Sequence, residues 1–147
     1  MLIPEAPKDK HMMNGLSFDE LKRCDSRSRF CILTQRTQQI LAQQAWVATS
    51  ILSRMVGLLS HDHLDSGEAL IIPSCQSIHT WFMRFAIDVV FVDRDGHVVG
   101  LKANLPPWRL TPLIWRAWGV VEMPAGTLAS VHLVVGDRLV VKPTRGA

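Results

Sequence analysis

Three soft potential metal ligands recur at an even spacing in the middle of the chain. Cys75, His79 and Met83 are four residues apart each time. This spacing places the side chains on one face of a strand and close together on a helix, so they could converge in either case. Cysteine with methionine favours Cu(I), and histidine and cysteine with a weak methionine is the blue-copper ligand set. A copper site is therefore one hypothesis, and it would need a second histidine such as His61 or His63.

The same cysteine starts a second hypothesis, covalent catalysis. Cys75, His79 and Asp88 are of the nucleophile, base and orienter types. However, no recognised motif surrounds Cys75, and no oxyanion-stabilising device is readable from the sequence. We therefore favour core packing for Cys75 and Met83, and we expect no cofactor.

Asp88 is the one charge between Ile87 and a run of four apolar residues. A buried carboxylate is costly unless it finds partners, and Arg84, Arg54 or backbone amides could supply them. We favour a structural role in which such bonds pin the hairpin that follows. The functional alternative is an anchor at a pocket floor for a cationic or hydrogen-bonding ligand.

Four tryptophans lie close together in the sequence: Trp81, Trp108, Trp115 and Trp118. Tryptophan is common at interfaces and at ligand mouths because it presents a large area with one polar group. Trp108 lies beside Arg109 in a segment with three prolines, 104–112, which predicts an extended surface loop. An aromatic with an arginine on such a loop could serve partner binding or stack a sugar or a nucleotide, although no phosphate loop supports a nucleotide.

Short hydrophobic runs separated by turn residues predict the elements that must position these side chains. Residues 87–92, IDVVFV, do not alternate, which is typical of a strand covered on both faces. DRDG at 93–96 predicts a turn, with Gly96 able to take positive φ, and residues 97–103 return as the partner strand.

Further elements follow from the same patterns. A capping box at Ser17 and Glu20 predicts a short helix over Ser17–Cys24, and Pro124 suits the first turn of a helix over 124–130. The remaining expected elements are a hairpin of strands at 30–33 and 39–48, a helix at 49–60, a strand at 69–73, a strand at 118–123, and one or two strands within 131–141. We expect a mainly β (α+β) fold: a small closed or nearly closed antiparallel β-barrel with one or two short helices, since closure removes exposed edges.

Composition limits the class of protein. The 147 residues predict one domain, and a net charge of +3 does not favour a nucleic-acid binder. Three cysteines form no even disulfide framework, no signal peptide is visible, and no apolar run reaches the ~18 residues of a membrane span. We expect a cytoplasmic monomer with a loose appendage containing a short helix at 1–28, a barrel domain at 29–142 and a tail at 143–147.

Four blocks of sequence carry a resemblance to a known family. They are SRMVGLL (53–59), CQSIHTWFMRFAIDVVFVDRDGHVV (75–99), PWRL (107–110) and VVEMPAGTL with the later GD (120–137). In this order they resemble the bacterial family catalogued as domain of unknown function 192, from about Phe30 to Lys142. The resemblance implies a compact β-barrel-like domain with a short helix after the first strands. It implies no activity, because that family has no established reaction.

Together these observations predict a small non-catalytic accessory module that binds a small ligand or a protein, with no nucleic acid and no membrane span. The strand expected over 79–88 would gather the binding residues at one mouth of the barrel: His79, Trp81, Arg84, Asp88, Trp108 and Arg109. The alternatives are a cysteine- or metal-dependent enzyme using Cys75, His79 and Asp88, or a copper-binding protein using Cys75, His79 and Met83.

Overall fold

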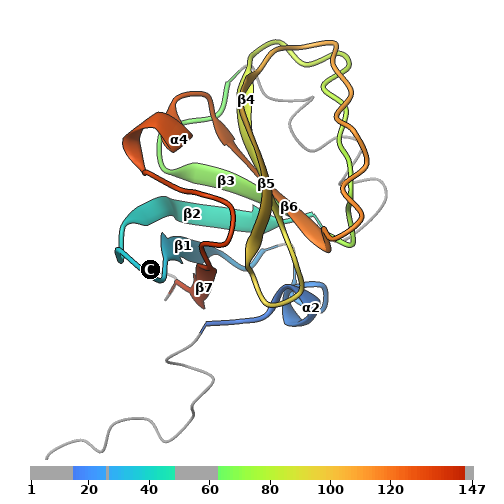
Figure 1. Ribbon diagram of the computed structural model, residues 1–147. Helices are drawn as coiled ribbons and strands as arrows, with labels where there is room; N and C mark the ends of the chain where they lie inside the picture. The colour runs from blue at the N-terminus through green and yellow to red at the C-terminus, as the bar shows by residue number, and fades with distance from the viewer. Residues whose placement is uncertain (1–14, 26, 49–62, 145–147) are drawn as a thin grey trace, which may run out of the picture.

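A computed structural model of the chain describes residues 15–25, 27–48 and 63–144 (Figure 1). Seven strands form one sheet in the order β5-β4-β6-β3-β2-β1-β7. The elements are α2 (Phe18–Leu21), β1 (Phe30–Thr34), β2 (Ile40–Val47), β3 (Glu68–Pro73), β4 (Ile87–Val92), β5 (Val98–Leu105), β6 (Gly119–Pro124), α4 (Thr127–Ser130) and β7 (Leu139–Pro143). The predicted mainly β class with short helices is confirmed.

The sheet curls until its two edge strands approach each other. The amide of Val98 at the start of β5 donates to the carbonyl of Asp137 (2.7 Å), and Gly136 donates back to Val98 (2.9 Å). Leu139 of β7 donates to Gly96 (2.8 Å). These bonds join the edges, which confirms a nearly closed, barrel-like sheet.

One pair of strands departs from the antiparallel expectation. β2 and β3 run parallel, with Gln44 opposite Glu68 and Val47 opposite Ile71, while the other paired strands are antiparallel. A parallel pair cannot be joined by a tight hairpin, and the connection between β2 and β3 is long enough for the chain to cross back. The expected helix at 49–60 and the block at 53–59 fall in this connection, outside the described residues.

β4 is an interior strand of the sheet, paired with both β5 and β6. All of its residues from Ile87 to Val92 are buried. Because successive side chains point to opposite faces, Val90 and Val92 join one hydrophobic cluster, and the odd-numbered residues join another. The prediction of a strand covered on both faces is confirmed.

The two hydrophobic clusters lie on opposite faces of the sheet. The barrel cluster takes side chains from every strand and from α2. The loop-side cluster takes side chains from β3, β4, β5 and β6, and from loop residues such as Ile78, Met83 and Ala117. The loops around these three residues therefore form a second layer over one face of the barrel.

α2 confirms the predicted capping box over a shorter helix. Ser17 donates its amide to the Glu20 carboxylate (2.7 Å), and its hydroxyl accepts from the Glu20 amide (3.3 Å). Phe18 and Leu21 are buried in the barrel cluster. The helix ends at Leu21 rather than Cys24.

The C-terminal region differs in two details from the expectation. Pro124 ends β6 opposite Ile87, and α4 begins only at Thr127. Gly126, with a φ of +96°, makes the turn between strand and helix, a conformation that glycine adopts without strain. Residues 131–141 supply only one strand, β7.

No helix among the described residues is long and apolar enough to cross a membrane.

Candidate functional site

Two loops that are distant in sequence pair with each other over the loop-side cluster. Residues 74–86 and 106–118, here called the double loop, run side by side (Figure 1). Thr80 donates to Arg109 (2.8 Å), Thr111 to Ile78 (2.9 Å), Ile114 to Gln76 (3.0 Å) and Cys75 to Trp118 (3.1 Å), all through backbone groups. Residues later in the segment 74–86 therefore pair with residues earlier in the segment 106–118, as in an antiparallel ribbon.

The double loop contains no regular strand. β3 ends at Pro73 and β4 begins at Ile87, with one isolated bridge between His79 and Leu110. The expectation of a strand over 79–88 is therefore wrong. Ser74 and Phe82 adopt positive φ angles of 53° and 65°, and this left-handed conformation interrupts extended backbone.

Thr80 is the buried link between the two segments. Its hydroxyl donates to the carbonyl of Pro106 (2.7 Å) and accepts from the amide of Arg109 (2.9 Å). Its carbonyl accepts from the amides of Trp108 (3.0 Å) and Met83 (3.2 Å). The sequence gives no signal for this role, because the partners are backbone groups of a distant loop.

Replacing Thr80 with valine should loosen the double loop selectively. The variant keeps the side-chain shape but leaves the Pro106 carbonyl and the Arg109 amide without their partner, a loss of about 1–3 kcal/mol. Hydrogen exchange should be faster at the Arg109 amide and unchanged in β4. Unchanged exchange at Arg109 would contradict this role. Thr37→Val, at an exposed threonine, is the control.

Two exposed aromatic side chains sit on strained backbone. Phe82 and Trp108 have φ angles of 65° and 63°, and their ring centroids lie 4.8 Å apart. A left-handed conformation costs a non-glycine residue roughly 1–2 kcal/mol, and both side chains remain exposed. Strain without compensating burial is typical of functional surfaces.

The same surface carries most of the exposed apolar side chains. Nine large hydrophobic residues are exposed in the described chain, and six belong to the double loop, at 46–79% exposure. These six are Trp81, Phe82, Trp108, Leu110, Leu113 and Trp115. We call them the aromatic face.

Five of the six predicted binding residues belong to the double loop that carries the aromatic face. The rings of His79 and Trp81 lie 5.1 Å apart. Trp108 and Arg109 are held beside them by the backbone bonds to Thr80. Arg84 is exposed in the same segment, two residues after Phe82.

Asp88 lies apart from these residues. The residue is 1% exposed, and its carboxylate accepts three backbone hydrogen bonds: from Asn104 (2.7 Å), Gly126 (3.1 Å) and Leu128 (2.8 Å). Its neighbours Ile87 and Val89 point into the loop-side cluster, so by alternation Asp88 points to the opposite face. These bonds agree with the structural role favoured from the sequence.

The copper hypothesis loses the regular geometry on which it rested. Residues 75–83 form neither a strand nor a helix, so an even spacing does not bring the three side chains to one face. Met83 is buried in the loop-side cluster, His79 is exposed, and the Cys75 thiol donates to the carbonyl of Ser77 (3.0 Å). His63 is exposed and contacts Asp65 (2.8 Å), while His61 is outside the described residues.

One group of possible metal ligands occurs in the described part of the chain: Asp93, Asp95 and His97. Asp93 accepts from the backbone amides of Asp95 and His97 (both 2.9 Å). Gly96 adopts the positive φ predicted for it (+89°), and a Cβ there would meet the Leu139 carbonyl at 2.6 Å. Turn formation therefore accounts for this group.

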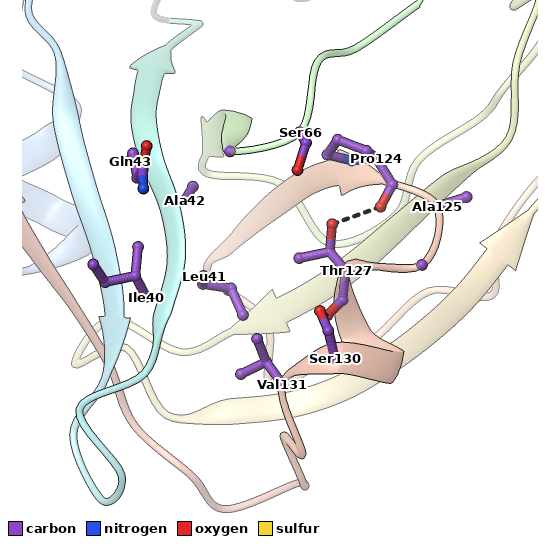
Figure 2. Close-up of a pocket in the computed structure, with 12 residues that line it drawn as sticks. Ile40, Leu41, Ala42, Gln43, Ser66, Pro124, Ala125, Thr127, Ser130 and Val131 are labelled. Atoms are coloured by element: carbon purple, nitrogen blue, oxygen red, sulfur yellow. Dashed lines mark hydrogen bonds between the residues drawn. The ribbon is translucent and has the colours of Figure 1, made fainter.

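A shallow groove of about 490 Å³ lies between β2 and α4 (Figure 2). Its lining is uncharged and comes from residues 40–43, 66–67, 124–127, 130 and 131. The hydroxyls of Thr127 and Ser130 already donate to the carbonyls of Pro124 (2.7 Å) and Thr127 (2.9 Å). With those donors engaged, the groove offers less recognition chemistry than the aromatic face.

Glu122 is a buried carboxyl that the sequence analysis missed. It lies in β6 between Leu70 of β3 and Val89 of β4. Both neighbours belong to the loop-side cluster. Burial raises the pKa of Glu122 to about 7. The only sequence signal is one acid within VVEM, where each flanking residue is apolar.

The fold and the site together define a small barrel-like β domain that presents an aromatic and basic double loop. The chain belongs to the DUF192 family, described as "Uncharacterized ACR, COG1430", which it matches over residues 32–141. The resemblance seen in the sequence is confirmed.

The relatives found by sequence similarity are archaeal, so the assignment of the family to bacteria is not confirmed. A UPF0127 protein of Thermococcus sibiricus is 31% identical over 97 residues, 63% of this chain and 62% of that protein. A UPF0127 protein of Pyrococcus furiosus is 43% identical over 63 residues, 43% of this chain and 53% of that protein. The chain therefore spans less than two thirds of these relatives.

Two solved structures share the fold. A protein of unknown function from Novosphingobium aromaticivorans superposes with a TM-score of 0.64 at 19% identity, over 76% of this chain and 82% of that one. A Sinorhizobium meliloti protein, provisionally described as a transcription regulator, gives 0.65 at 19% identity, over 78% and 92%. At this identity the likeness concerns the fold alone.

Proposed function

We propose that this chain is a small non-catalytic binding module that engages its partner through the aromatic face of the double loop. The observation that carries the proposal is the pair Phe82 and Trp108, which present exposed rings from strained backbone. Exposed aromatic side chains beside arginine are typical of residues that dominate binding energy. Trp81, His79 and Arg109 extend the same surface.

The bonds of the double loop support a preorganised surface. Thr80 and Thr111 tie the two segments together, and Thr111 accepts from the Ile78 amide (2.9 Å) while it donates to the Ile78 carbonyl (3.3 Å). Ile78 and Met83 pack below. A surface held in this way loses little conformational entropy when it binds.

The enzyme and copper alternatives receive less support. A triad would need the Asp88 carboxylate for a side-chain partner, and its oxygens already accept three backbone bonds. A copper site would need Met83 to leave the loop-side cluster. We keep the binding module as the function for these reasons.

A photo-cross-linking amino acid in place of Trp108 tests the proposal in cells. The same amino acid in place of Val134, which is exposed outside the double loop, is the matched control. We expect an adduct with protein or lipid that forms from position 108 and not from position 134. Equal adducts from both positions, or none from either, would refute the binding module.

Replacing Phe82 with asparagine should separate binding from stability. Asparagine tolerates the left-handed conformation, so relief of strain offsets the lost ring contact, and the free energy of unfolding should change by less than about 1 kcal/mol. The adduct from position 108 should weaken several-fold. Phe85→Asn is the control, because Phe85 packs against the loop-side cluster and should lose about 2 kcal/mol or more of stability. Equal stability losses in both variants would contradict a binding role for Phe82.

We also propose that the module is a cytoplasmic monomer. All three cysteines lie in the described residues and none forms a disulfide, as expected in a reducing compartment. Burial raises the pKa of the Cys24 and Cys31 thiols, which favours their unreactive protonated form. Fractionation of cells and size-exclusion chromatography test these two statements.

A further inference from the structure

The double loop concentrates the net charge of the protein as well as its exposed apolar area. Residues 74–86 and 106–118 contain Arg84, Arg109 and Arg116 and no aspartate or glutamate. The chain has 16 basic and 13 acidic residues, a net charge of +3. The remainder therefore has 13 of each sign, and the whole excess of positive charge lies on the double loop.

The arginines and the aromatic face share one surface. Arg109 follows Trp108 directly, and its guanidinium donates to the Trp108 carbonyl (3.3 Å). Arg84 follows two residues after Phe82, and Arg84 and Arg109 are both exposed. Arginine side chains therefore accompany the exposed rings at the end of the double loop that Thr80 fastens.

Two acidic groups border the other end of this surface. Asp93 and Asp95 line a hollow together with Trp115 and Arg116. They reduce the positive potential at Arg116, whereas Arg109 lies toward the end that Thr80 fastens. A negatively charged partner is thus expected at Trp81, Phe82 and Trp108 rather than at Trp115.

We propose that this surface docks on an anionic phospholipid bilayer, an inference that rests on the proposed binding function. Tryptophan favours the bilayer interface, where its ring is apolar and its N–H remains hydrogen-bonded. Arginine is attracted to anionic headgroups. Side chains as exposed as Phe82 and Trp108 stand out from the surface, and a fluid bilayer accepts them without a matching pocket.

An acidic protein is the other partner that this charge could attract. The observations favour lipid because the face combines six large apolar side chains with arginine and has no acidic residue of its own. Protein interfaces of the non-obligate kind are about as apolar as ordinary surface and have a mixed polar rim. The two partners make different predictions for purified components.

Co-sedimentation of the full chain with vesicles tests the inference. Vesicles of phosphatidylcholine with about 30% phosphatidylglycerol should bind at least about tenfold more protein than vesicles of pure phosphatidylcholine, and high salt should reduce the difference. Vesicles carrying brominated acyl chains should quench tryptophan emission. The variant with Trp81, Trp108 and Trp115 all changed to phenylalanine should lose this quenching.

Matched variants identify the surface. Arg109→Glu should lower vesicle binding by about tenfold or more, since it reverses a charge next to the bilayer. Arg27→Glu makes the same change at an exposed arginine of another loop and should lower binding much less. Phe82→Asn should reduce binding while the protein stays folded. Equal losses in Arg109→Glu and Arg27→Glu would show a merely general charge effect and overturn the inference.

The failure of this inference is distinguishable from the failure of the binding module. If anionic vesicles bind no better than neutral ones, and the cross-linker at position 108 still captures a protein, the lipid inference is refuted and the module stands. If anionic vesicles bind no better than neutral ones and the cross-linker at position 108 captures nothing, both the lipid inference and the binding module are refuted.

Discussion

Asp88→Ala is expected to lower the free energy of unfolding by about 3–5 kcal/mol, the effect of removing a buried charged partner from its hydrogen-bonded neighbours. The amides of Asn104, Gly126 and Leu128 would each lose their acceptor. These amides belong to the end of β5, the turn after β6 and the first turn of α4. The Asp88 carboxylate therefore holds three separate parts of the chain around the start of β4.

Urea unfolding followed by tryptophan fluorescence measures this loss. Asp95→Ala removes the same group at an exposed position and should change stability by less than about 0.5 kcal/mol. Asp88→Asn keeps one acceptor oxygen and should fall between the two. A loss below about 1 kcal/mol in Asp88→Ala would contradict the anchoring role.

Acidification from pH 8 to pH 5 is expected to stabilise the protein through Glu122. Burial raises the pKa of this carboxyl to about 7 from its ordinary 4.5, so the folded state holds a proton that the unfolded state releases between these values. The contribution of Glu122 to the free energy of unfolding is fully present below the unfolded-state pKa of 4.5. It is lost as the pH rises through the folded-state pKa of about 7. The upper limit is about 3 kcal/mol, from 1.36 kcal/mol for each pKa unit.

Glu122→Gln should remove most of this pH dependence, because an amide does not ionise. The difference between the parent protein and the variant, measured by urea unfolding at pH 5 and pH 8, isolates the group. Asp137 contributes at lower pH, since the hydrogen bond from Arg36 lowers its pKa and its stabilisation is lost only as pH falls below the ordinary range. An equal slope in both proteins would contradict a buried, protonated Glu122.

Local patterns in the sequence were sufficient for β4 and its turn. The four consecutive apolar residues 89–92 predicted a strand covered on both faces, and the glycine of DRDG takes the predicted positive φ. The capping box at Ser17 also formed. Each of these features depends on residues within a few positions of one another.

The double loop could not be predicted in the same way. Its two segments join through single backbone bonds and buried threonines such as Thr80, without a repeating pattern. The spacing of Cys75, His79 and Met83 implied convergence only for a regular strand or helix. The aromatic residues were recognisable as candidates, but the pairing of Phe82 with Trp108 depends on backbone conformations that no local periodicity encodes.

Glu122 and the parallel pair of β2 and β3 were missed for a related reason. A single acid in VVEM suits a strand with one exposed face, and only the layer formed by the loop-side cluster buries that face. Whether that layer exists depends on residues far from 122. The direction of β3 relative to β2 depends on the path of the connection between them, not on the residues within either strand.

The pairing of β1 with β7 has a consequence for co-translational folding. Phe30 lies opposite Pro143, and Thr34 opposite Leu139. β1 therefore cannot form this pairing until β7 has been translated. Until then one side of β1 is an open edge that can recruit a strand from a neighbouring nascent chain. The interval before the final strand emerges is therefore the period of greatest vulnerability to misassembly.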